Sequence, residues 1–326
     1  MTSREMLGVL SGAVFSKTAR GIGLLEGLRR RLGSDLVRTD VSMANLCTYR
    51  VGGPARLAVF PATTEQLSSV VRFFAEQDVP FDILGMGSNV LVSDAGINGP
   101  VVVTSNMDRI VIHDRRLRAQ AGASCTDVVQ AALEHGLAGI EFFHKLPGSV
   151  GGAAFMNARA FGQEFRDRAV RAIVVDERGQ THSMDLSPDL FAYKRSPFME
   201  RGLIVAEVEW VLEEAPPDRI QAQMEANGRH RSQNGEDEYP SCGCVFKNPS
   251  GESAGRLVDA CGLKGLRIGG AWVSERHGNF VVHDGQACAG DIRAVMETVR
   301  RVVAEKAGVV LDYEVRFLGQ WPHRDD

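Results

Sequence analysis

Three glycine-bearing turns in the first half of the chain constrain its fold most strongly. They occupy residues 48–54, 84–90 and 147–153, and each lies next to a predicted strand. Glycine lets backbone N–H groups approach a ligand closely, because no side chain stands in the way. Three such turns together favour a site for a large phosphate-bearing cofactor over three unrelated turns.

Residues 84–90 have the sequence Leu-Gly-Met-Gly-Ser-Asn-Val between two predicted strands. A dinucleotide-binding Rossmann motif needs a third glycine where Val90 stands and a helix after it, so that motif is excluded. The segment predicts a pyrophosphate cradle or, taken alone, a plain turn. Residues 147–153, followed by Asn157, contain too many small side chains to fill a core. They indicate a surface for a flat ligand or a tight bend in a sheet.

Apolar periodicity predicts helices packed on mixed sheets in at least two units, which is an α+β fold. Leu67, Val70, Val71 and Phe74 share one helical face, so residues 64–77 form a helix with Thr63 or Thr64 as its cap. Further helices are predicted at 23–32, 126–135, 254–261 and 292–307, with a polar helix after residue 217. Strands are predicted at 55–60, 81–84, 90–93, 101–104, 110–113, 117–121, 172–175, 204–212 and 309–318.

A length of 326 residues predicts two or three packed units. The linker candidate is residues 215–217, where paired prolines disfavour both helix and sheet. The predicted division is an N-terminal extension 1–21 and units at 22–104, 105–214 and 218–326.

Charge and cysteine content narrow the classes of partner and compartment. Lys and Arg total 37 against 41 for Asp and Glu, so no basic field is available to hold a nucleic acid. Six scattered cysteines indicate a reducing compartment, and the expectation is a cytoplasmic protein. Residues 6–15 are mostly apolar but lack a small-residue cleavage site, and no run approaches the ~20 apolar residues of a membrane helix.

Seven segments, in this order along the chain, resemble successive signatures of the UDP-N-acetylenolpyruvoylglucosamine reductase (MurB) family. They are residues 48–55, 84–94, 146–157, 191–198, 240–249, 267–282 and 314–319. The resemblance implies the FAD-binding fold of the vanillyl-alcohol oxidase (PCMH) type. Its two α+β subdomains, 22–104 and 105–214, would hold FAD, and a C-terminal α+β domain, 218–326, would cover the substrate. It also implies the compact family type without a tyrosine loop.

The resemblance implies an oxidoreductase activity. Family members use NADPH and FAD to reduce UDP-N-acetylglucosamine enolpyruvate to UDP-N-acetylmuramate in peptidoglycan biosynthesis, which supports cell-wall biogenesis, cell shape and cell division. The expected partners are this small-molecule substrate and NADPH, without nucleic acid or membrane, and the expected state is a monomer. Two alternatives stay open: a flavin oxidase of the same fold with another substrate, and a paralogue that binds FAD or a UDP-sugar without turnover.

The family's proton donor is a serine in Gly-Ser-x-Phe-Lys-Asn-Pro, and Cys244 replaces it here. A thiol has an ordinary pKa of about 8.5 and is a better acid than a hydroxyl, so the exchange can preserve proton transfer. Cys242 lies two residues away and raises a metal or redox hypothesis. No Cys or His pair at zinc spacing accompanies it, so we predict no metal site and a buried structural role for Cys242.

Lys194 stands where the family has the arginine that polarises the substrate carboxylate. Lysine keeps the charge but loses the bidentate fork. Arg195 is the alternative, and we favour Lys194 because neighbouring side chains on an extended segment face opposite ways. Glu314 matches the family's catalytic carboxylate, and without that match it would be interpreted as a solvated strand charge. Beside a substrate carboxylate its pKa is expected to rise.

The resemblance therefore implies Lys194, Cys244 and Glu314 as catalytic residues. Substrate binding is implied for Tyr193, Lys247, Asn248 and Asn279, while His277 is predicted to be structural. The implied FAD-binding residues are Thr48, Tyr49, Arg50, Gly53, Gly85, Met86, Gly87, Ser88, Asn89, Val90, Gly122, Pro147, Gly148, Ser149, Gly152, Ala153 and Asn157.

Overall fold

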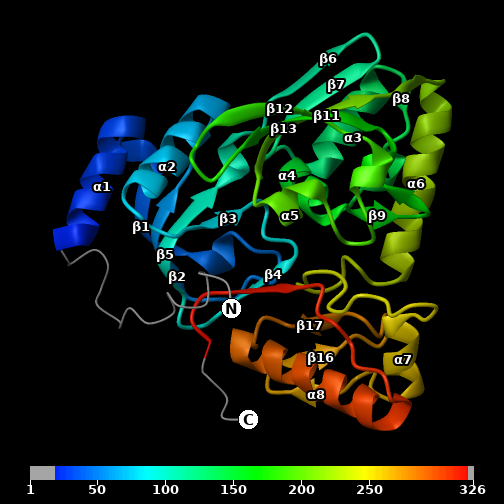
Figure 1. Ribbon diagram of the computed structural model, residues 1–326. Coiled ribbons are helices and arrows are strands. Elements are labelled where there is room, and N and C mark those ends of the chain that lie inside the picture. The colour runs from blue at the N-terminus through cyan, green and yellow to red at the C-terminus, as the bar shows by residue number, and fades with distance from the viewer. Residues whose placement is uncertain (1–18, 322–326) are drawn as a thin grey trace.

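The computed structural model describes residues 19–321, in three packed units. In Figure 1 the first unit is blue to cyan, the middle unit is mostly green, and the C-terminal unit, orange and red, lies below both. The apolar stretch 6–15 and most of the predicted extension 1–21 lie outside the described residues. Within the described part of the chain, no helix is long and apolar enough to cross a membrane.

The first unit is a four-stranded sheet covered by two helices. The strand order is β1 (Val37–Ser42), β2 (Pro54–Val59), β5 (Ile97–Val103) and β3 (Asp82–Leu84), with β1 antiparallel and the others parallel. Helix α1 spans Ala19–Leu32 and α2 spans Thr64–Glu76. The side chain of Thr63 caps α2 by accepting a hydrogen bond from Gln66 N. Of the two candidate caps, Thr63 and Thr64, the structure uses Thr63.

Strand β1 was not predicted from the sequence. Only Val37 is buried in it, and the polar residues that follow show no apolar alternation. Its place is fixed by pairing with β2, which is a contact between segments and leaves no local pattern. By contrast, α2 buries the predicted stripe of Leu67, Val70, Val71 and Phe74, so this helix is confirmed.

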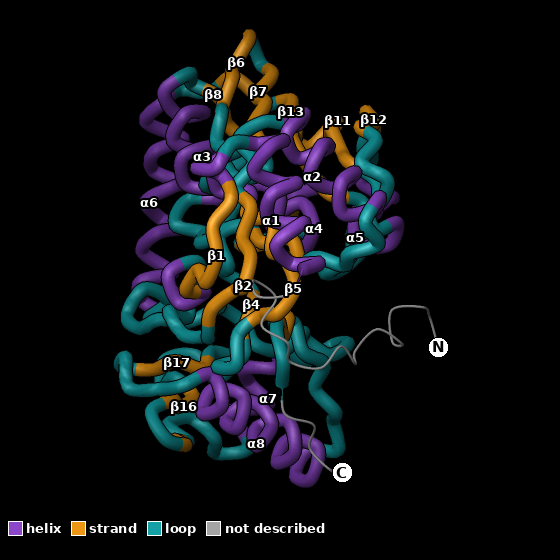
Figure 2. The backbone as a smooth tube through the Cα atoms, turned by 90° about the vertical axis from the view of Figure 1, so that its left-hand side faces the viewer, coloured by secondary structure: helices purple, strands orange, loops and turns teal. Residues whose placement is uncertain are grey.

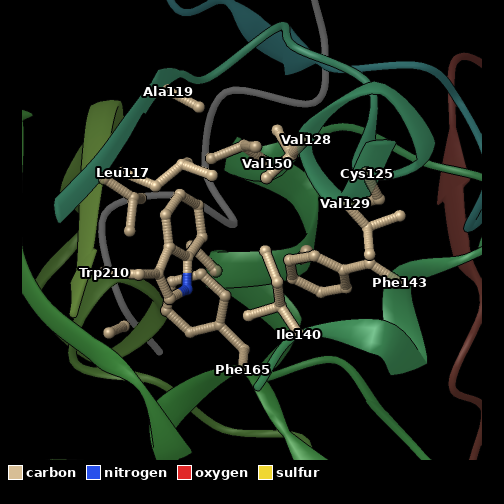
Figure 3. Packing of buried hydrophobic residues seen from close by; sticks show 14 of the residues in the cluster. Leu117, Ala119, Cys125, Val128, Val129, Ile140, Phe143, Val150, Phe165 and Trp210 are labelled. Atoms are coloured by element: carbon tan, nitrogen blue, oxygen red, sulfur yellow. The ribbon is translucent and has the colours of Figure 1, made fainter. Parts of the chain in front are cut away.

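The middle unit is a five-stranded antiparallel sheet. Its order is β12 (Thr181–Asp185), β11 (Ala169–Val175), β13 (Ile204–Val211), β7 (Arg116–Gln120) and β6 (Ile110–His113). The predicted hairpin of β6 and β7 is confirmed. Trp210 lies at the centre of the core, and Figure 3 shows it against Phe165 with Leu117 and Val150 close by. The Trp210 and Phe165 rings meet edge to face at 5.7 Å.

Shorter elements complete the middle unit. Helix α4 (Val150–Met156) was not predicted, because the two glycines in its first turn are weak helix formers. Ser149 begins it by accepting a hydrogen bond from Gly152 N. The remaining elements are α3 (Cys125–Glu134), α5 (Pro197–Arg201), β8 (Leu137–Ala138), β9 (Arg159–Ala160), β10 (Gln163–Glu164) and β14 (Glu213–Glu214). Short 3-10 helices occupy Ser34–Leu36, Met43–Asn45, Thr104–Asn106, Glu141–Phe143, Phe165–Asp167 and Pro188–Leu190.

The predicted boundary at residues 214–218 differs from the packing. The proline pair opens helix α6 (Pro217–Gln233) with Pro217 in its first turn, where proline is tolerated. Ile220 and Met224 join the core of the middle unit, and Asn227 Nδ2 donates to Glu141 O at 3.0 Å. Figures 1 and 2 show α6 along the edge of this unit. The packing therefore places α6 with the middle unit, and the C-terminal unit begins after it.

The C-terminal unit has a small antiparallel sheet covered by two helices. The strands are β15 (Arg267–Ile268), β16 (Ala271–Val273) and β17 (Val281–His283), and the helices are α7 (Ala254–Ala260) and α8 (Ala289–Ala307). Gly308 ends α8 in the left-handed region, as predicted. The predicted strand 309–318 is wrong in extent, since only β18 (Arg316–Leu318) is a strand. It pairs in parallel with β4 (Val90–Val92), next to the first unit.

The first and C-terminal units are joined through polar contacts, both buried and at the surface. Tyr49 is fully buried, and its hydroxyl donates to Val281 O at 3.0 Å. His283 Nε2 lies 2.6 Å from Tyr49 O. Asp94 accepts from the amides of Ala289 and Gly290, both at 2.9 Å, and so caps helix α8 from the other unit. These contacts fix the C-terminal unit against the turns that carry glycine.

Candidate active site

The three glycine-bearing turns meet at one place in the structure. Thr48 N donates to Gly87 O at 3.2 Å, which joins the first turn to the second. A Cβ on Gly85 would lie 2.3 Å from Ser149 Oγ, so the second and third turns touch where a side chain would not fit. The cluster predicted from the sequence is therefore a single surface built by distant segments.

The turn at residues 85–89 presents main-chain donors. In the described part of the chain, no acceptor takes a hydrogen bond from the amides of Met86, Gly87 or Ser88. Gly87 has a φ of 62°, in the left-handed region that favours glycine. Consecutive unpaired amides in such a turn form a concave site for anions. These residues fit the pyrophosphate of FAD.

Several predicted cofactor residues make structural contacts with the protein instead. The side chain of Tyr49 is buried in the core of the C-terminal unit, so it does not face the turns. A Cβ on Gly53 would lie 2.2 Å from Asp94 O, and one on Gly122 would lie 1.8 Å from Thr104 O. Close backbone packing explains both glycines. The Tyr49 side chain is therefore structural, and the contact of this residue with the cofactor stays a prediction.

The side chain of Asn157 also makes its hydrogen bonds within the protein. It is buried in a left-handed conformation at the end of α4. Its Nδ2 donates to Glu164 Oε2 at 2.9 Å and to Ala192 O at 3.1 Å, and its Oδ1 accepts from Arg166 N. Its side chain thus positions the segment that leads to Lys194. The other predicted residues lie on or beside the turns: Arg50, Met86, Pro147 and Gly152 are exposed, Val90 begins β4, and Ala153 is buried in α4.

Lys194 and Glu314 form an ion pair between the middle and C-terminal units. The Lys194 side chain is 13% exposed and that of Glu314 is 10% exposed. Lys194 has a φ of 56° in a tight turn whose ends, Ala192 and Arg195, exchange backbone hydrogen bonds. Arg195 turns outward, and its guanidinium lies 2.8 Å from Glu200 on the surface. The turn therefore directs Lys194, and not Arg195, toward Glu314.

Backbone pairing brings Cys244 beside this ion pair. Glu314 N donates to Val245 O at 2.8 Å, and Lys247 N donates to Asp312 O at 2.9 Å. Burial, with a smaller contribution from the charge of Glu314, raises the pKa of Cys244 to about 12. The thiol is therefore protonated at neutral pH. The three residues proposed for catalysis lie together.

The carboxyl of Glu314 has a pKa raised above 4.5, mainly by burial, and the charge of Lys194 partly offsets the rise. The direction agrees with the sequence expectation. The main cause is the protein interior rather than a second carboxylate, since the shift is present without substrate.

Two asparagines position this cluster. Asn279 is buried, its Oδ1 accepts from Phe246 N at 2.9 Å, and its Nδ2 donates to Phe246 O at 2.8 Å. Both ends of its amide bind Phe246, so Asn279 has a structural role here, and its contact with substrate stays a prediction. Asn89 Nδ2 donates to Glu314 O at 3.1 Å. The second glycine-bearing turn thus holds Glu314 directly, across 225 residues of sequence.

The other substrate candidates gather at the outer side of the cluster. Tyr193 is 37% exposed, and its hydroxyl accepts from Asn248 N at 3.1 Å. Asn248 Oδ1 accepts from Ala254 N at the start of α7. The guanidinium of Arg159 lies over the Tyr193 ring, 5.4 Å from its centre. Sequence reasoning missed Arg159, since nothing near it in the chain marks it as a site residue.

Comparison with known proteins gives matches over most of the chain. Residues 55–185 match the model of an FAD binding domain, and residues 234–318 match that of the C-terminal domain of UDP-N-acetylenolpyruvoylglucosamine reductase. The reductase of Clostridium novyi is 35% identical over 92% of this chain and 98% of its own length. That of Lactococcus lactis subsp. cremoris is 37% identical over 87% of this chain and 95% of its own. The chain belongs to the UDP-N-acetylenolpyruvoylglucosamine reductase (MurB) family.

The crystal structure of MurB from Thermus caldophilus resembles this chain with a TM-score of 0.73 at 35% identity. The match covers 86% of this chain and 99% of that one. The predicted α+β fold with an FAD-binding domain is therefore confirmed. The two matched domains lie on either side of helix α6, which agrees with its packing on the middle unit.

Proposed function

We propose that this chain reduces UDP-N-acetylglucosamine enolpyruvate to UDP-N-acetylmuramate, with NADPH as reductant. This makes it a cytoplasmic enzyme of peptidoglycan biosynthesis, with consequences for cell shape and division, acting as a monomer. The observation that carries the proposal is the Lys194, Glu314 and Cys244 cluster, which Asn89 ties to the glycine-bearing turns. The first two units hold FAD, and the C-terminal unit covers the substrate.

Bound FAD supplies the chemistry of hydride transfer, and the amides of residues 86–88 fit its pyrophosphate. Reduction of an enolpyruvyl group adds a hydride to the terminal carbon, so negative charge develops toward the carboxylate. Lys194 Nζ is the group that binds this carboxylate and stabilises the charge. As a compact charge it acts without the bidentate geometry of arginine.

Cys244 supplies the proton for the carbon next to the carboxylate. Its thiol is protonated at neutral pH because burial raises its pKa to about 12. A fixed and protonated donor beside the reacting carbon is what general acid catalysis requires. Glu314 holds the Lys194 ammonium in place until the substrate carboxylate arrives, and the nearby charge of Lys247 also favours the ionised carboxylate.

The test is an anaerobic flavin titration of the purified protein. NADPH should bleach the yellow flavin, and UDP-N-acetylglucosamine enolpyruvate should restore the colour. Bleaching without recovery, together with fast reoxidation by oxygen, would identify an oxidase of the same fold. A protein that lacks flavin or does not react with NADPH would be a binding paralogue. Either result would overturn the proposed reaction.

A further inference from the structure

Arg159 lies at the edge of the cluster with a guanidinium that the protein compensates only in part. It is in β9, just after Asn157, and its side chain is 45% exposed. The nearest carboxylate is Glu164, whose Oε1 lies 3.8 Å from Arg159 Nε. That carboxylate is already shared, since its Oε2 accepts from Asn157 and pairs with Arg166 at 2.9 Å.

The Tyr193 ring holds this guanidinium in place. Arg159 lies over the ring at 5.4 Å from its centre, a distance typical of a cation–π contact. The ring itself is fixed, because its hydroxyl accepts from Asn248 N across the unit boundary and Lys194 follows it in a tight turn. An arginine seated on a fixed ring loses little conformational freedom when it binds a ligand.

The cluster is buried at one end and exposed at the other, and these two ends match the carboxylate end and the nucleotide end of the proposed substrate. The enolpyruvyl carboxylate belongs at the buried Lys194. The next residues outward are Tyr193 and Asn248, with Lys247 and Arg159 beside them. The nucleotide end of a UDP-sugar carries a diphosphate, whose oxygens match the planar fork of arginine.

We propose that Arg159, seated on the Tyr193 ring, binds the diphosphate of the nucleotide-sugar substrate and helps to determine specificity for it. This inference rests on the proposed function. NADPH also carries a diphosphate, so the shared ligand chemistry has two sources. The geometry favours the sugar nucleotide, because Tyr193 is the direct neighbour of the residue assigned to the substrate carboxylate.

The experiment compares Arg159→Ala and Arg159→Lys with the holoenzyme of natural sequence. Arg171→Ala is the matched control. Arg171 is also half exposed, and it pairs with Asp185 between strands β11 and β12 of the middle unit. We expect Arg159→Ala to raise both KM for the enolpyruvyl substrate and Kd for UDP-N-acetylglucosamine about tenfold or more, as for loss of one charge-assisted hydrogen bond. The values of kcat and of KM for NADPH should stay within about twofold, and Arg159→Lys should recover part of the affinity.

Three results would overturn the assignment. They are an unchanged Kd for UDP-N-acetylglucosamine, a raised KM for NADPH with no change for the sugar nucleotide, and an equal loss in Arg171→Ala. Flavin content checks that each variant is folded. Failure of the proposed function can be told apart from failure of the Arg159 assignment. In the first case the flavin of the unmodified protein would be bleached by NADPH and would not recover with the enolpyruvyl substrate. Binding of UDP-N-acetylglucosamine is measured separately and tests Arg159 in either case.

Discussion

Lys194 and Glu314 are 120 residues apart in the sequence, yet their side chains form a largely buried ion pair. Removing one partner of a buried pair leaves an uncompensated charge, so such pairs are sensitive to substitution. This pair also joins the middle unit to the C-terminal unit. It therefore links the relative position of two units to the charge that the proposed reaction needs.

Lys194→Ala should lower kcat roughly 10²-fold, as expected for loss of one group that stabilises developing charge. Arg195→Ala should keep full activity, because Arg195 pairs with Glu200 on the surface. Steady-state kinetics of both variants test this prediction. Loss of activity in Arg195→Ala with normal activity in Lys194→Ala would exchange the two roles.

Cys244→Ser should remain active, because a hydroxyl at this position can also supply a proton. Cys244→Ala should lose about 10²-fold to 10⁴-fold in the reoxidation of reduced flavin by substrate, the range of general acid catalysis. Bleaching by NADPH should be unaffected in both variants. Stopped-flow measurement of the two half-reactions separates these effects, and a fully active Cys244→Ala would rule out the thiol as the acid.

Alkylation should not inactivate the enzyme at pH 8. The thiolate is the reactive form, and burial raises the pKa of Cys244 to about 12. Iodoacetamide should therefore modify the exposed Cys288 first, with activity retained. Peptide mass mapping against residual activity checks the order, and labelling of Cys244 before Cys288 would contradict it.

Glu314 should give the pH profile an acid limb at a pH above 4.5. As pH falls through the raised pKa, the carboxylate takes up a proton and the ion pair with Lys194 is lost. The same raised pKa should lower the free energy of unfolding as pH rises from 4.5 through it, because the folded state keeps the proton longer. Glu314→Gln should remove both dependences. A variant with an unchanged acid limb would show that another group causes it.

Asn279→Ala should reduce the free energy of unfolding by about 2–4 kcal/mol, because two buried main-chain groups of Phe246 lose their partners. Asn279→Asp should cost at least as much, because a carboxylate oxygen would face Phe246 O and bury an unpaired charge. Asn45→Ala, at an exposed asparagine, should stay within about 0.5 kcal/mol. Urea denaturation measures all three. A stable Asn279→Ala with a raised substrate KM would instead support the direct substrate contact expected from the sequence.

The sequence by itself determined the elements whose signals are local. The apolar stripe of α2 and its Thr63 cap, and the stripe of α8 with its Gly308 stop, are periodic patterns that one segment contains entirely. The glycine-bearing turns are local signals too. The ordered family segments indicated FAD and the reductase fold for the same reason, since each segment can be recognised without its neighbours in space.

Only the tertiary structure decided which residues meet. Nothing near Asn89 indicates that its side chain holds the carbonyl of Glu314, and nothing near Asn279 indicates that Phe246 occupies both ends of its amide. The short β18, the weakly helical α4 and the place of α6 depend in the same way on partners in other segments. Contacts between distant residues repeat at no fixed interval along the chain, so periodicity cannot reveal them. Lys194, Cys244 and Glu314 are far apart in the sequence, and only the folded structure shows that they lie together.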